Sequence, residues 1–103
     1  MQRLTAALLT LTAIVASSGN AGAADAAHGE TLAKRWCAAC HIVAPDQTSG
    51  NTQAPPFSAI ARKPGFDAAQ VALYLLTPHP KMPDMGLSRS EAADLAAYIA
   101  AQK

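Results

Sequence analysis

The segment Trp36-Cys37-Ala38-Ala39-Cys40-His41 decides the fold and the chemistry of this 103-residue chain. Two cysteines three positions apart, followed at once by a histidine, are the pattern of a c-type haem attachment site. If the segment continues a helix, Cys37, Cys40 and His41 lie at i, i+3 and i+4 and share one face. Both sulfurs could then bond to haem vinyl groups while the imidazole meets the iron. The motif therefore predicts one covalent haem c, held by two thioethers.

Three other uses of the two cysteines stay open at this point. A thioredoxin-type redox pair would suit Trp36 beside Cys37, but that fold needs a βαβ pattern, which the chain lacks. A zinc site wants four ligands, and only His28 and His79 would remain to complete one. A structural disulfide would close too short a loop to stabilise much. Haem attachment is therefore the favoured interpretation.

The pattern of the remaining chain predicts an all-α fold, because no stretch alternates apolar and polar residues with β-branched enrichment. A first helix is expected from Ala26 to Cys40, with Asp25 as its N-cap. One face of this helix carries small residues at Gly29 and Ala33. Glycine is costly inside a helix, so this face predicts a second helix packed closely against it.

Two further helices are indicated by their start signals. One begins after Asp67, with Gln70 at capping-box spacing, and stops before Pro78. The last begins after Ser88, with Glu91 completing another capping box. Its apolar face carries Leu95, Tyr98 and Ile99. The predicted fold is a small domain of about three main helices, plus a long loop wrapped around the haem.

That long loop covers residues 42–65 and is rich in proline and glycine. Residues 57–61 are expected to form a short helical turn inside it. Loops of this length in small domains are normally functional or disordered, and wrapping a cofactor would explain this one. A second irregular segment, residues 78–86, contains three prolines and is expected to be stiff and non-helical.

Residues 1–23 have the pattern of a cleaved secretory signal peptide. Arg3 gives a basic start, an uncharged and mostly apolar run follows, and Ala21-Gly22-Ala23 offers small residues for cleavage. Cleavage after Ala24 fits nearly as well, and an uncleaved membrane anchor is the alternative. The mature domain would be residues 24–103, located in a bacterial periplasm.

The charge of the mature domain argues against two classes of partner. Of the eight basic residues, Arg3 lies in the predicted signal, so the remaining seven balance the seven acidic ones. Nucleic acid and anionic membrane surfaces both call for a strong basic excess. Neither is expected as the main partner.

From residue 24 onward the chain resembles a small class I cytochrome c over nearly all of its length. Gly29 stands eight residues before Cys37, where this family places a glycine of its N-terminal helix. Leu95 and Tyr98 match residues of the C-terminal helix that packs across that glycine. The chain departs from larger members in lacking their tryptophan-bearing middle loop, and it has Ala33 where some members have an aromatic residue.

The resemblance also implies the surroundings of the iron. His41 would be the proximal axial ligand, and the carbonyl of Pro55, in Pro55-Pro56-Phe57, would accept its imidazole N–H. Lys81-Met82-Pro83 looks like the loop that carries the distal methionine, and Pro83 biases Met82 away from helical conformation. The other candidates for the distal position are Met85, His79 and His28.

Several further side chains are candidates for haem contact or for core packing alone: Trp36, Phe57, Ile60, Tyr74, Leu76, Leu95 and Tyr98. Arg62 and Lys63 could pair with haem propionates, or be solvated loop charges.

The resemblance implies a one-electron carrier rather than an enzyme. Histidine and methionine together as axial ligands raise the reduction potential of a haem. The expected partners are a periplasmic dehydrogenase as electron donor and an oxidase or reductase as electron acceptor. The protein itself is expected to be a monomer. A dedicated electron-accepting subunit of a periplasmic dehydrogenase is the close alternative. A ligand-binding or peroxidatic haem protein would need an open distal position, and a thiol–disulfide oxidoreductase would need free cysteines.

Overall fold

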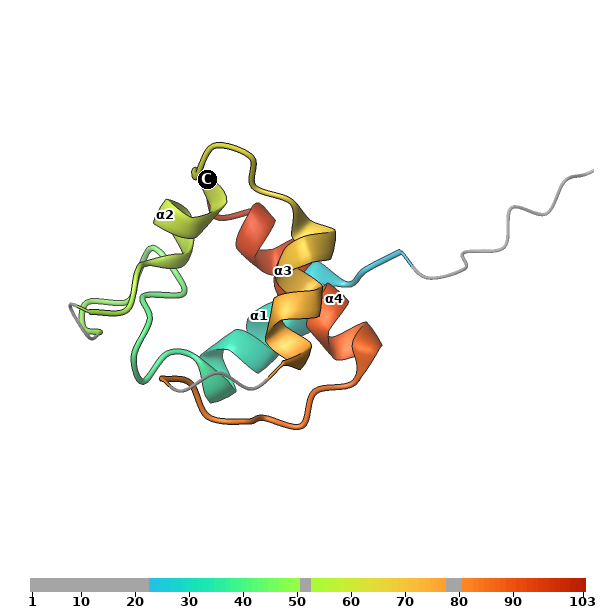
Figure 1. Cartoon of the computed structure of the whole chain (residues 1–103). Helices are drawn as coiled ribbons and strands as arrows, with labels where there is room; N and C mark the ends of the chain where they lie inside the picture. The colour runs from blue at the N-terminus through green and yellow to red at the C-terminus, as the bar shows by residue number, and fades with distance from the viewer. Residues whose placement is uncertain (1–22, 51–52, 78–80) are drawn as a thin grey trace, which may run out of the picture.

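The computed structural model describes residues 23–50, 53–77 and 81–103, and all the regular structure in these ranges is helical (Figure 1). The helices are α1 (Ala26–Trp36), α2 (Phe57–Ala61), α3 (Ala68–Leu76) and α4 (Arg89–Ala100). The all-α prediction is confirmed, including the short helical turn at residues 57–61. Residues 1–22 of the predicted signal peptide, and His79, lie outside the described residues.

Helix α4 organises the domain, since it contacts each of the other three helices. The crossing of α1 and α4 depends on Gly29. A Cβ atom at Gly29 would lie 2.0 Å from the carbonyl oxygen of Asp94 and 2.9 Å from Cβ of Tyr98. The predicted close approach of a second helix to this glycine is therefore confirmed.

The core lies between α1, α2, α4 and the loop that follows α1. Its buried hydrophobic members are Leu32, Ala33, Cys37, Val43, Ala44, Phe57, Ala61, Ala92, Leu95, Ala96, Tyr98 and Ile99. Three of the predicted core candidates, Phe57, Leu95 and Tyr98, are among them. Trp36 and Tyr74 are not core residues, because their side chains are 41% and 53% exposed.

The predicted helix starts are supported by side-chain caps. Asp25 accepts a hydrogen bond from the His28 amide, and Asp67 accepts from the amides of Ala69 and Gln70. Ser88 and Glu91 form the complete reciprocal capping box at the start of α4. These caps satisfy amide groups that have no partner inside the helix.

The end of α1 differs from the prediction, because the helix stops at Trp36 rather than at Cys40. The Ala38 amide bonds to the carbonyl of Ala33, five residues back, and the Cys40 amide bonds to Cys37, three residues back. The regular four-residue ladder is therefore lost at this point. The cysteine–histidine motif folds as a tight turn after the helix, with the His41 amide bonded to the Cys37 carbonyl at 2.8 Å.

Within the described part of the chain, no helix is both long and apolar enough to span a bilayer.

Candidate functional site

The turn after α1 gives the two cysteines different surroundings. Cys37 is buried in the core, whereas Cys40 is exposed. Burial raises the pKa of the Cys37 thiol to about 11, because the low-polarity interior disfavours the thiolate. The expected helical arrangement, with both sulfurs and the imidazole on one helix face, is thus replaced by a turn.

His41 is held by the loop that follows it in the chain. Its Nδ1 donates a hydrogen bond to the carbonyl oxygen of Pro55 at 2.7 Å. Its ring also lies 5.4 Å from the ring of Phe57, centroid to centroid. Since Nδ1 carries the proton in this bond, Nε2 is the ring nitrogen with a free lone pair. Two of the residues named from the sequence, His41 and Pro55, are therefore brought together.

The loop around His41 is anchored to the core. The Phe57 amide donates to the carbonyl of Ile42 at 2.9 Å. The buried hydroxyl of Tyr98, on α4, donates to the carbonyl of Val43 at 2.6 Å. The rings of Phe57 and Tyr98 meet edge to face, 6.3 Å apart. These contacts connect the histidine segment to the α1–α4 crossing.

Gln47 ties the same loop together by its side-chain amide. Nε2 donates to the carbonyls of Ala38, His41 and Ser49, at 3.0, 2.7 and 2.8 Å. Oε1 accepts from the amide of Val43 at 2.9 Å. The loop after the cysteine–histidine motif is therefore hydrogen-bonded to the motif by a residue only six positions beyond His41.

Met82 and Met85 both lie, partly buried, in the segment that leads into α4. Met85 sits inside a turn in which Asp84 accepts a hydrogen bond from the Gly86 amide at 3.0 Å. Gly86 has a φ of +58°, a backbone conformation that suits glycine. Met82 precedes this turn and is followed directly by Pro83.

Three of the other candidate haem contacts line a hollow between α2 and α3. This hollow has a volume of about 430 Å³, and its lining includes Ile60, Lys63 and Tyr74. Cys37, His41 and the methionines do not line it. Arg62 lies away from this hollow, beside the C-terminal residues Gln102 and Lys103.

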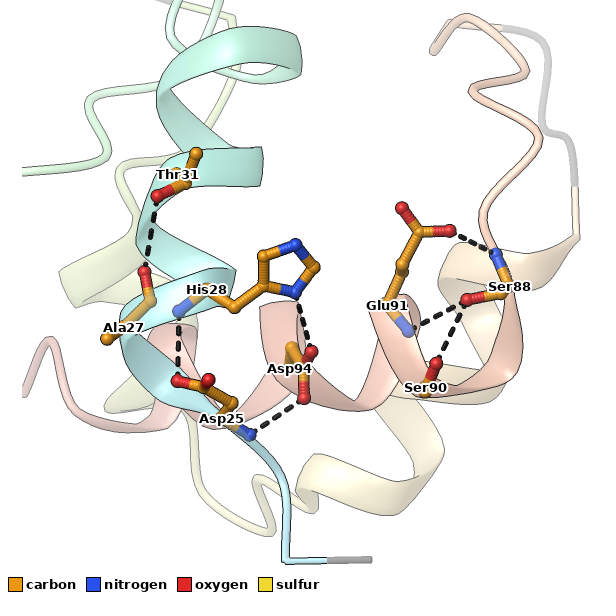
Figure 2. A network of polar contacts seen from close by, with 8 residues as sticks. All are labelled: Asp25, Ala27, His28, Thr31, Ser88, Ser90, Glu91 and Asp94. Carbon is orange, nitrogen blue, oxygen red and sulfur yellow. Dashed lines mark hydrogen bonds and ion pairs between the residues drawn. The ribbon is translucent and has the colours of Figure 1, made fainter.

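His28 lies in the first turn of α1, at the opposite end from the cysteine–histidine motif, and its partner is on α4, as Figure 2 shows. Its Nδ1 lies 2.8 Å from Oδ2 of Asp94 on α4, and Oδ1 of the same carboxylate accepts from the Asp25 amide at 2.7 Å. The hydrogen bond with Asp94 raises the pKa of His28. The same bond, followed by that from Asp25, lowers the pKa of Asp94. His28 is thus part of the helix crossing.

Sequence reasoning missed two polar side chains: Gln47, which bonds to the cysteine–histidine motif, and Asp94, which bonds to the start of α1. Gln47 is one of several polar residues in a proline-rich loop, and no spacing distinguishes it. The partner of His28 is 66 residues away in the chain, so only the helix crossing reveals it.

The residues present fit a covalently attached haem. Two thiols and an imidazole lie within five consecutive residues, and the hydrogen bond to Pro55 leaves Nε2 of His41 available to a metal. A second interaction of this kind is typical of metal-binding histidines, because it fixes the ring orientation and the tautomer. Cys37, Cys40 and His41 would hold the group, and Met82 or Met85 could supply a thioether.

Comparison with known proteins shows the family to which the chain belongs. Residues 24–99 match the family model described as cytochrome C oxidase, cbb3-type, subunit III. The chain is 54% identical over 87 residues to cytochrome c-552 of Bradyrhizobium diazoefficiens, which covers 84% of each protein. No solved structure matches significantly. Covalent haem c is the cofactor that this family implies, and the cysteines it needs are Cys37 and Cys40. The chain belongs to the cytochrome c family of electron-transfer proteins.

Proposed function

We propose that the protein is a one-electron carrier with a single haem attached to Cys37 and Cys40 and with His41 and Met82 as axial ligands. The observation that carries this proposal is the 2.7 Å hydrogen bond from His41 Nδ1 to Pro55, in the turn that also contains both cysteines. The relationship to cytochrome c-552 supports the carrier role.

The residues of the chain have separate tasks in this proposal. When bound, the haem supplies an iron that gains or loses one electron. Pro55 orients the ring of His41, and Phe57 packs beside it. A histidine and a methionine that stay bound in both redox states raise the potential and limit reorganisation during transfer. The protein otherwise holds the ligands and excludes water.

The burial of Cys37 argues against this residue as the attacking thiol of a redox pair, and leaves only the exposed Cys40 for that role. A redox-active cysteine needs an accessible thiolate with a lowered pKa. Here burial raises the pKa of Cys37 to about 11, so this thiol is a poor nucleophile.

The first test is whether haem stays with the polypeptide. The full chain would be produced with a haem-maturation system, purified from the periplasm, and its visible spectra recorded oxidised and reduced. We expect sharp low-spin bands, and haem that resists extraction by acidified organic solvent. A colourless protein with two titratable thiols would overturn the proposal and favour the thiol-redox alternative.

The distal ligand is tested by a matched pair of variants. Met82→Ala should abolish the thioether–iron charge-transfer absorption and lower the reduction potential, because the iron loses a soft donor. Met85→Ala should keep both properties of the wild type. The opposite result would assign the distal position to Met85. Absence of this absorption from a low-spin wild type would point to His79 as the distal ligand, and rapid carbon monoxide binding by the wild type would indicate an open distal position.

We also propose that residues 1–23 are removed on export and that residues 24–103 act as a periplasmic monomer. The partners would be a periplasmic dehydrogenase and an oxidase or reductase. N-terminal sequencing of the purified protein separates cleavage after Ala23 from cleavage after Ala24. Co-purification with a dehydrogenase at a fixed ratio would favour the alternative of a dedicated subunit.

A further inference from the structure

We infer that Gln47 is the positioning residue of the haem-binding segment, because its side-chain amide fixes the backbone that carries Cys40 and His41. The inference rests on the proposed function, since the segment needs exact placement only if it holds a haem.

The contacts of Gln47 reach both the motif and the chain that follows it. Nε2 donates to Ala38 and His41 within the turn, and to Ser49 beyond it. Oε1 accepts from the amide of Val43. One side chain thus bonds to backbone groups at four positions. With two N–H groups for three carbonyls, at least one of these bonds is shared.

The hydrogen bonds from Gln47 satisfy backbone carbonyls that lie beyond the end of α1. Because α1 stops at Trp36, the carbonyls of Ala38 and His41 lie beyond its hydrogen-bond ladder. Polar backbone groups that are partly buried need a partner, and leaving one unpaired is costly. Gln47 supplies that partner for both carbonyls.

The result is that His41 is held at two points. Pro55 fixes its ring, and Gln47 fixes its main-chain carbonyl. The chain also packs directly on this peptide. A Cβ atom at Gly50 would lie 3.2 Å from the carbonyl oxygen of Cys40 and 3.1 Å from the Ile42 side chain. Residues 47–50 therefore pack against the backbone of the motif.

Glutamine is suited to this position because its amide both donates and accepts. Glutamate has the same shape but offers acceptors only, so it would set a negative charge against three carbonyl oxygens. Methionine has a similar length but lacks both functions. Groups that orient metal ligands from behind typically change metal affinity or activity by about 10- to 100-fold when removed.

The test compares Gln47→Glu and Gln47→Met in the haem-loaded protein, with Gln70→Glu on the exposed surface of α3 as a charge-matched control. The readouts are the reduction potential and the hyperfine-shifted resonances of the axial histidine in the ferric state, which report ring orientation. We expect both Gln47 variants to shift these signals, and the control to keep them. Exchange of the Val43 amide should become about tenfold faster in Gln47→Met, the effect of one lost hydrogen bond.

A purely structural role would give another pattern. If both Gln47 variants unfold at lower temperature but keep the wild-type potential and histidine resonances, the inference is wrong. If Gln47→Glu yields no haem protein, Gln47→Asn takes its place, because it keeps the amide but is one methylene too short to reach every partner. A wild-type protein without covalent haem would overturn the proposed function, and this inference with it.

Discussion

Tyr98 joins the helix crossing to the histidine loop through one buried hydroxyl, which donates to the Val43 carbonyl at 2.6 Å. We expect Tyr98→Phe to lower the free energy of unfolding by about 1 to 3 kcal/mol, because it leaves a buried carbonyl without its partner. Urea unfolding of the haem-loaded protein measures this loss. Tyr74→Phe is the control, since Tyr74 is 53% exposed and water can replace a lost bond there. Equal losses in the two variants would argue against a special role for the Val43 bond.

Among single residues, those with local signals could be predicted from the sequence. Asp25, Asp67 and Ser88 precede apolar periodic segments, and each is an N-cap in the structure. Gln47 could not be found in this way, because its importance comes from where the folded loop places its amide. A polar residue in an irregular segment has no period that reveals its partners.

At the scale of the elements, the crossing of α1 and α4 requires a glycine. Alanine at position 29 would gain about 1 kcal/mol of helix propensity, yet its Cβ would overlap the backbone of Asp94. We expect Gly29→Ala to be destabilised by about 2 kcal/mol or more, since overpacking outweighs the gain. Thermal unfolding would show this, with Thr31→Ala on the exposed face of α1 changing little. A Gly29→Ala protein as stable as the wild type would mean that the helices can separate without cost.

The ion pair across this crossing should make stability depend on pH. The raised pKa of His28 stabilises the fold below its usual value of 6.5, and this contribution is lost as pH rises through the folded-state pKa. The lowered pKa of Asp94 stabilises the fold above 3.8, and is lost as pH falls through its folded-state value. The ion pair therefore contributes most to the free energy of unfolding between about pH 3.8 and about pH 6.5.

The measurement is the free energy of unfolding of the wild type and His28→Gln from about pH 5 to about pH 8. The difference between them should be modest, because His28 is on the surface, and should shrink as pH rises. In an Asp94→Asn background the same histidine change should lose this pH dependence. A difference that stays constant across the range would show that the pair does not titrate as described.

The helix boundaries show where sequence patterns stop being sufficient. The starts of α1, α3 and α4 follow from capping residues close by in the chain. The end of α1 does not, because the residues after Trp36 keep helical spacing in the sequence but fold as a turn. What holds that turn is the side chain of Gln47 and the packing of Gly50, both supplied by the following loop. An interaction between segments has overridden a local preference.

At the scale of the whole molecule, the balance of charge predicts weak electrostatic steering. The acidic and basic residues would cancel if Arg3 is removed with the proposed signal peptide. Steered association changes rates by about 10- to 1000-fold, and falls steeply with salt. We expect the rate of electron exchange with a purified redox partner to change by less than about tenfold between low and physiological ionic strength. Stopped-flow kinetics would measure it, and a steep slope would reveal a local charged patch.

The close crossing of α1 and α4 also sets the order in which the protein can be completed. Asp25 and Asp94 are 69 positions apart, so the contact closes nearly the whole domain into one loop. A growing chain that has reached only residue 88 already contains both cysteines, His41 and both candidate methionines, but it has no surface on which Gly29 can pack. Long-range closure of this kind slows folding relative to helical proteins with local contacts. The core that buries Cys37 includes Leu95, Tyr98 and Ile99 of α4, so it is incomplete until α4 has been added, and the Cys37 thiol can react during that time.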